Sequence, residues 1–129
     1  MFSQLQQKIF PIYFAMQTAL PLVVLASHPS AAYAELLSTE TAVPMGVAFL
    51  TSVVNMTIVG PATVRVMKER KRVETKEGKK YYDAGEKSAE MQALNKKFGA
   101  VHGISSLLNL VGLLSTVAYG ATLGAKLVL

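Results

Sequence analysis

The sequence predicts an all-α integral membrane protein with three transmembrane helices, and the distribution of charge leads to this prediction. The 129 residues carry 21 charged side chains (13 basic and 8 acidic), of which 17 lie between Arg65 and Lys97. The rest of the chain falls into three long uncharged stretches, residues 9–34, 41–64 and 98–125. Because a soluble helix needs charge on its outer face, this pattern excludes a soluble globular domain. An apolar content of 51% also excludes a disordered chain.

Each uncharged stretch is long enough for one membrane span, which needs about 20 mainly apolar residues. The three spans are predicted at about 9–27, 42–64 and 104–125. Pro44 falls in the first turn of the second span, where its missing N–H costs little. Pro21 and Pro61 fall inside spans, so we expect kinks there. The whole chain, residues 1–129, is therefore interpreted as a single membrane domain.

The basic segment, residues 65–97, is predicted to be an amphipathic helical loop between the second and third spans. Its first ten residues contain no Gly or Pro, so the second helix should continue past the membrane and break near Gly78. Ser88 is a suitable N-cap for the next helix, with Glu90 in its first turn. The apolar stripe of that helix consists of Met91, Leu94, Phe98 and Val101. We expect a short interfacial helix that leads into the third span, and a helix that docks a partner is the alternative.

The uneven charge also predicts the orientation in the membrane. Lys8 and the basic segment would lie on one face, whereas Glu35, Glu40 and Lys126 would lie on the other. By the positive-inside rule, the N-terminus faces the cytoplasm, or the matrix in a mitochondrial inner membrane. A signal peptide that ends at Ala32-Tyr33-Ala34 is an alternative. The length of the apolar run, with its glutamine and two prolines, argues against it.

Several functional classes receive no support from the composition. The pI of 9.6 does not indicate nucleic-acid binding, because the basic residues are mixed with acids between two apolar stretches. With no cysteine, the chain cannot form disulfides, iron–sulfur clusters or cysteine-type zinc sites. We see no nucleophile–base pair, Gly-rich phosphate loop or carboxylate dyad in the sequence. The expected protein is therefore not an enzyme and needs no cofactor, no metal and no nucleic-acid partner.

Polar residues inside the spans are the best functional candidates, because a polar group in lipid needs a partner. One face of the third span carries four small or polar residues, one turn after His102: Ser105, Asn109, Gly112 and Thr116. The second span offers Thr51, Ser52 and Asn55, and the first offers Gln17 and Thr18. We expect these groups to hydrogen-bond between helices. A polar pathway or a small-ligand pocket is the alternative.

Two further patterns predict contacts at the helix surfaces. Small residues recur every fourth position at Gly112, Thr116, Gly120 and Gly124, which favours close helix packing within the bundle or between copies. The span ends on the basic side bring Arg65, Glu69, Arg70 and His102 to the same face of the membrane, and Glu69 is expected to form a salt bridge with Arg70 or His102. A Glu–His pair alone would be a weak metal ligand set.

The basic segment also predicts a surface for anionic lipid or a partner. Its cations with this predicted role are Arg65, Lys68, Arg70, Lys71, Arg72, Lys96 and Lys97.

Three stretches of the chain resemble the transmembrane-protein-205-like family, and most closely its fungal members. The first contains Phe10, Pro11, Tyr13 and Phe14; the second contains Asn55, Gly60, Pro61, Thr63, Met67, Glu69 and Arg70; the third runs from Leu94 to Leu110 and contains His102, Ser105, Ser106 and Asn109. The resemblance implies a compact helical bundle in an endomembrane or the plasma membrane. Some members of that family are linked with drug resistance or export.

The resemblance has one departure. Members of that family usually have a further span ahead of the Leu5-Gln6-Gln7 stretch, which this chain lacks, so a three-span form should depend more on a partner.

These observations lead to three hypotheses about function. The first is a structural or accessory subunit of a larger membrane assembly, whose partners are the lipid bilayer and other membrane subunits or copies of itself. The second is a small transporter or efflux accessory with a polar path along Asn55 and Asn109. The third is membrane-surface binding through the basic segment.

Overall fold

A computed structural model describes residues 2–27 and 33–127 of the chain. Helices account for 88% of these residues, and no strand occurs among them. Three helical segments are long and apolar enough to cross a membrane: Leu5–Ala26, Thr39–Glu77 and Ala89–Lys126. The predicted all-α class with three membrane spans is thereby confirmed, and the protein is membrane-embedded.

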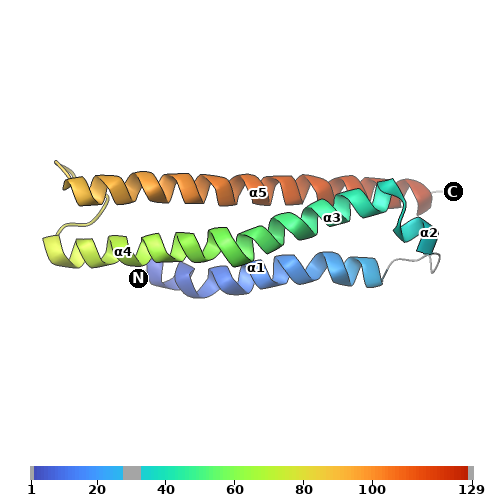
Figure 1. The fold of residues 1–129 in the computed structure, drawn as a ribbon, viewed down its shortest axis with the longest axis horizontal. Helices are drawn as coiled ribbons and strands as arrows, with labels where there is room; N and C mark the ends of the chain where they lie inside the picture. Colours follow the sequence, from blue (N-terminus) through green and yellow to red (C-terminus); the bar gives the residue numbers. More distant parts are fainter. Residues whose placement is uncertain (1, 28–32, 128–129) are drawn as a thin grey trace.

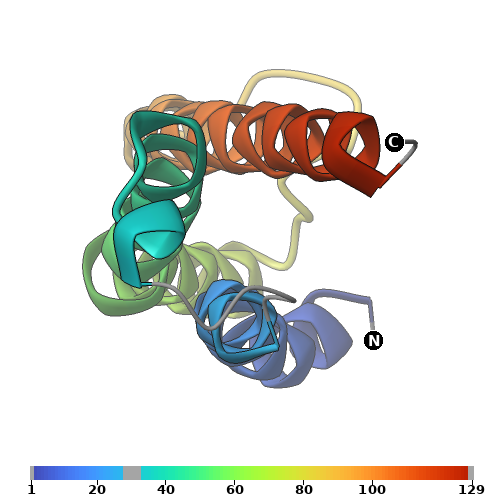
Figure 2. The same ribbon diagram turned by 90° about the vertical axis from the view of Figure 1, so that its right-hand side faces the viewer.

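The helices form three long rods that lie side by side (Figure 1). In chain order they are α1 (Phe2–Ala26), α2 (Tyr33–Leu36), α3 (Thr39–Val54), the π-helical segment η1 (Asn55–Val59), α4 (Gly60–Glu77) and α5 (Ala89–Leu127). Since α3, η1 and α4 follow one another without a loop, they make one rod, called here the α3–α4 rod. In an end-on view, α1 and α5 lie on two sides of this rod (Figure 2).

As the sequence predicts, the basic segment lies at one end of the molecule, and Glu35, Glu40 and Lys126 lie at the other. Helix α1 begins toward the end where α4 is joined to α5, and α5 ends near α2 (Figure 1). At the α2 end, Lys126 Nζ lies 3.6 Å from Glu40 Oε2. The alternative of a cleaved signal peptide concerns Ala32-Tyr33-Ala34, which begins outside the described residues.

The second span begins earlier than predicted, so Pro44 is not in its first turn. Ser38, with an extended backbone (φ −61°, ψ 146°), is the N-cap, and α3 starts at Thr39. Pro44 therefore lies inside the helix, where it has no N–H to donate to the carbonyl of Glu40.

The helix bends where Pro61 was expected to kink it, and a π-helical turn accommodates the proline. Pro61 has no N–H for the carbonyl of Thr57, and its ring would crowd that carbonyl in a regular α-helix. In η1 the Gly60 N–H instead bonds to the carbonyl oxygen of Asn55, five residues back. The axis of the rod changes direction between α3 and α4 (Figure 1). Pro11 and Pro21 lie inside α1, which is helical from Phe2 to Ala26.

The basic segment is a helical hairpin, and its second helix continues into the third span without a break. As predicted, α4 ends at Gly78, which has a left-handed backbone (φ 66°), and the Ser88 hydroxyl oxygen accepts a hydrogen bond from the Met91 N–H at 3.1 Å. From there α5 runs through its whole 39 residues without a break. No proline interrupts it, and its glycines cost too little to break a helix packed along its length.

The extramembrane parts of α4 and α5 pack on one another through an apolar cluster. Val66 and Val73 of α4 are buried against Met91 and Leu94 of α5, and Phe98 packs beside them. The stripe predicted for the start of α5 therefore has its partner in the same chain, which leaves no reason to assign this stripe to docking another protein.

Gly60 should tolerate no side chain, because it lies against both α1 and its own π-turn. A Cβ atom there would come within 2.7 Å of the Asn55 carbonyl oxygen and 2.9 Å of the Phe14 ring. We expect Gly60→Ala to lower the free energy of unfolding by about 1–3 kcal/mol through overpacking. The free energy of unfolding is measured by titration with sodium dodecyl sulfate in mixed micelles. Unfolding is monitored by energy transfer between fluorescent labels on cysteines introduced in α1 and α4.

The matched control is Gly46→Ala in α3, where a Cβ would meet no atom within 4 Å. This change should leave the stability unaltered or raise it by up to about 1 kcal/mol. Equal effects of the two substitutions would contradict the close approach of Phe14 to Gly60.

Candidate functional site

An amide pair inside the membrane joins the α3–α4 rod to α5. Asn55, at the start of η1, is fully buried, and its Nδ2 donates hydrogen bonds to Asn109 Oδ1 at 2.9 Å and to the Ser105 carbonyl oxygen at 3.3 Å. The structure thus brings together three of the candidate residues. The Oδ1 atom of Asn55 is buried and has no hydrogen-bond partner among the described residues.

The serine and threonine hydroxyls of the spans do not make the interhelical bonds that we expected. Ser52 donates to the carbonyl of Ala48 at 2.6 Å, and Thr116 donates to that of Gly112 at 2.9 Å, each within its own helix. Hydroxyls reach the carbonyl four residues back, so they satisfy themselves without a second helix. Ser106, which the resemblance singled out, is exposed.

Only part of the small-residue stripe packs inside the chain. Gly112 is buried, and a Cβ there would lie 3.0 Å from Thr51 Oγ1, so α5 approaches α3 closely at this point. A Cβ at Gly120 or Gly124 would meet no atom within 4 Å. At 3.6 residues per turn, a spacing of four advances about 40° around the helix at each step, which carries the stripe away from α3.

An open groove lies at membrane depth between α1 and α5, with α3 as its floor; we call it the α1–α5 groove. Its volume is about 480 Å³. Its lining includes the polar or small residues Tyr13, Gln17, Ala48, Ser52, Asn109, Gly112 and Thr116. Gln17 Oε1 is buried and, within the described part of the chain, accepts no hydrogen bond. Gln17, in the wall of this groove, therefore carries an unsatisfied acceptor oxygen that is buried within the chain.

At the basic end, Arg70 has aromatic partners instead of the predicted carboxylate. Arg70 is buried, and its guanidinium carbon lies 3.7 Å from the centre of the Tyr81 ring and 4.5 Å from that of Phe98. Phe98 in turn stacks on His102, with ring centres 5.4 Å apart. The expected salt bridge from Glu69 to Arg70 or His102 does not form, because Arg70 is held over aromatic rings where cation–π attraction stabilises it.

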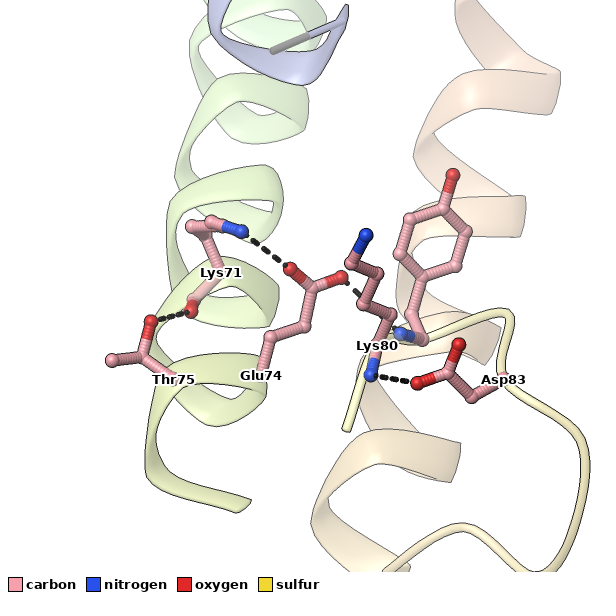
Figure 3. A network of polar contacts seen from close by, with 6 residues as sticks. Lys71, Glu74, Thr75, Lys80 and Asp83 are labelled. Carbon is pink, nitrogen blue, oxygen red and sulfur yellow. Dashed lines mark hydrogen bonds and ion pairs between the residues drawn. The ribbon is translucent and has the colours of Figure 1, made fainter. Parts of the chain in front are cut away.

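Carboxylates that the sequence analysis did not single out hold the hairpin loop in place. Glu74 accepts hydrogen bonds from Lys71 Nζ at 3.0 Å and from the Tyr81 N–H at 3.2 Å (Figure 3). Asp83 accepts one from the Lys80 N–H at 2.7 Å (Figure 3). No spacing rule links Glu74 to Tyr81 across a turn, so only the folded loop shows the contact.

At the same end, some cations form ion pairs with carboxylates and others do not. Arg72 and Lys76 of α4 lie 3.0 Å and 3.5 Å from the carboxylate oxygens of Glu90 in α5. A hydrogen bond to the Tyr82 side chain is the main cause that raises the pKa of Lys80 above its ordinary value. The cations of the predicted surface that have no ion pair among the described residues are Arg65, Lys68, Arg70, Lys96 and Lys97.

Comparison with known proteins adds one finding. The family described as Domain of unknown function (DUF4149) matches residues 1–72, which is more than half of the chain. The matched part contains α1, α3, η1 and most of α4, and so includes Asn55 and Gln17 but not Asn109. No match is found among curated proteins, and none among solved structures.

The Asn55–Asn109 pair should contribute a measurable coupling energy. We expect a double-mutant cycle of Asn55→Leu and Asn109→Leu to give about 0.6 kcal/mol, and at most about 1.7 kcal/mol, as for other hydrogen bonds between membrane helices. The coupling energy is obtained from the same titration with sodium dodecyl sulfate, with fluorescent labels on cysteines introduced in α3 and α5. Thr57→Val is the control for Asn55→Leu, since Thr57 is exposed and bonds only to Val53 of its own helix. A coupling energy of zero would contradict the contact.

Proposed function

The chain belongs to the DUF4149 family of membrane-type domains, and on this premise we propose that it is a non-enzymatic structural or accessory subunit of a larger membrane assembly. The observation that carries the proposal is Gln17 in the α1–α5 groove. Its Oε1 atom is buried without a partner among the described residues, at a depth where no water is present to replace one.

An unsatisfied acceptor in hydrocarbon favours the arrival of a donor from outside the chain. A second membrane helix that carries a donor side chain would satisfy Gln17 once that side chain turns its buried Oε1 atom into the groove. The apolar side chains of the second helix would pack on the groove walls. Gly112 and Ala48 line the groove without large side chains, so no bulky group blocks its floor. We propose that the occupant is a transmembrane helix of another subunit.

The groove also supports a role without catalysis. The side chains that line it are apolar groups, amides and hydroxyls, with no carboxylate or imidazole to act as an acid or base. Such a lining suits helix packing. It does not suit a reaction that moves protons.

Transport along a polar path has weaker support. The hypothesis needs Asn55 and Asn109 to face a passage, but Asn55 is fully buried and its amide hydrogens are engaged with Asn109 and Ser105. These hydrogen bonds attach η1 to α5 and do not line a passage. Binding of the membrane surface by the basic segment stays a separate candidate, because five of the seven cations predicted for that surface have no ion pair within the described residues.

A finer relationship, to the transmembrane-protein-205-like family, is part of the proposal. It is supported by motif residues from distant stretches, Asn55 with Ser105 and Asn109, that contact one another in the bundle. Residence in an endomembrane or the plasma membrane follows from that relationship. The mitochondrial inner membrane is the alternative.

Removing the acceptor should weaken the proposed assembly. We expect Gln17→Leu to lower the amount of subunit that co-purifies with the chain, with an association constant reduced between about threefold and twentyfold, as for one interhelical hydrogen bond. Extraction of the full chain in mild detergent, followed by native mass spectrometry, measures the assembly and the identity of the added mass.

Thr18→Val is the matched control, because Thr18 is the next polar residue and bonds only to the Phe14 carbonyl of its own helix. This variant should assemble as the parent chain does. A lone monomer for the parent chain would contradict the proposal, and so would an added mass equal to a second copy of this chain.

A further inference from the structure

We propose that a second groove, between α1 and α4, binds one anionic phospholipid, with the lipid phosphate held by Arg65 and Lys68. This α1–α4 groove has a volume of about 390 Å³, within the range of about 300–1,000 Å³ that ligand pockets occupy. Its apolar lining consists of Phe10, Pro11, Phe14, Met56, Pro61 and Val64. It shares no lining residue with the α1–α5 groove, so the proposal is independent of the proposed function.

The charge of the groove is entirely positive. Arg65 and Lys68 are three residues apart on α4, so they lie on the same face of the helix. Both are exposed, and neither has an ion pair or hydrogen bond with another described residue. Lys71, the next cation on this helix after Arg70, is by contrast paired with Glu74. Two free cations without an acid in the lining complement a phosphate group.

The position of the two cations matches that of a lipid headgroup. Arg65 is the first charged residue after the uncharged stretch 41–64, so it lies where the second span leaves the hydrocarbon. The apolar lining extends from there into the span, toward Met56 and Phe14. An acyl chain along this lining and a phosphate on the cations give the arrangement of basic lipid pockets between membrane helices.

The sequence also provides the space for this groove. Gly60 lets Phe14 lie directly against α4, since a Cβ there would come within 2.9 Å of the Phe14 ring. Pro61 follows it and presents its ring to the groove without a backbone donor that would need a partner. The lining therefore consists of rigid apolar surfaces up to the two cations.

Retention of lipid by the purified full chain tests the proposal. After reconstitution in vesicles of phosphatidylcholine with a minority of phosphatidylglycerol and re-extraction, native mass spectrometry should show one retained phosphatidylglycerol. The double variant Arg65→Gln and Lys68→Gln should bind it about thirtyfold more weakly, because each cation near an anionic lipid accounts for roughly a fivefold change. The double variant Lys96→Gln and Lys97→Gln removes the same charge from exposed positions outside the groove and should retain the lipid.

A second variant tests the acyl chain without any change of charge. Val64→Phe narrows the groove and should also lower retention, while the fold stays measurable by the micelle titration. Equal losses in the two double variants would mean general attraction to the basic surface and would overturn the proposal. No retained phosphatidylglycerol on the parent chain, or full retention by Val64→Phe, would overturn it as well.

Discussion

The bundle depends on the requirement that a polar group in hydrocarbon finds a partner. Apolar side chains gain little by leaving lipid for another apolar surface, so they do not by themselves determine which helix faces touch. The amide hydrogen bond from Asn55 to Asn109 determines which faces of η1 and α5 touch, because it can form at only one register of the two helices. Gly112 then allows α5 to approach Thr51, and Gly60 allows α1 to approach α4 through Phe14.

Outside the membrane, the same helices are held by different forces. There the hydrophobic effect operates, and the cluster around Val73 and Met91 buries apolar surface between α4 and α5. Arg70, enclosed by the rings of Tyr81 and Phe98, attaches the loop to this hairpin. One continuous α5 therefore links a hairpin stabilised in water to a bundle stabilised in lipid. The register of α5 against α4 in the hairpin and its register against the α3–α4 rod in the membrane are therefore linked.

Sequence patterns predicted the elements well and their contacts only in part. The spans, the helix end at Gly78 and the cap at Ser88 follow from local chemistry. The π-helical turn does not follow from local chemistry, since Pro61 predicts a bend but not the backbone hydrogen bonds that produce it. The partner of Arg70 was missed because the expectation paired it with the carboxylate nearest in sequence, whereas the loop that carries Tyr81 folds back onto it.

The α1–α4 and α1–α5 grooves differ in their unmatched groups: the first has cations without anions in its lining, and Gln17 in the wall of the second has an acceptor oxygen without a donor. We propose that a helix of another subunit fills the α1–α5 groove. Because the chain has no cysteine, a photoactivatable cross-linker can be attached in native membranes at Leu113→Cys, which lines that groove, or at Leu107→Cys, which does not. We expect a discrete protein adduct from position 113 alone. Adducts of equal yield from both positions, or none from 113, would contradict it.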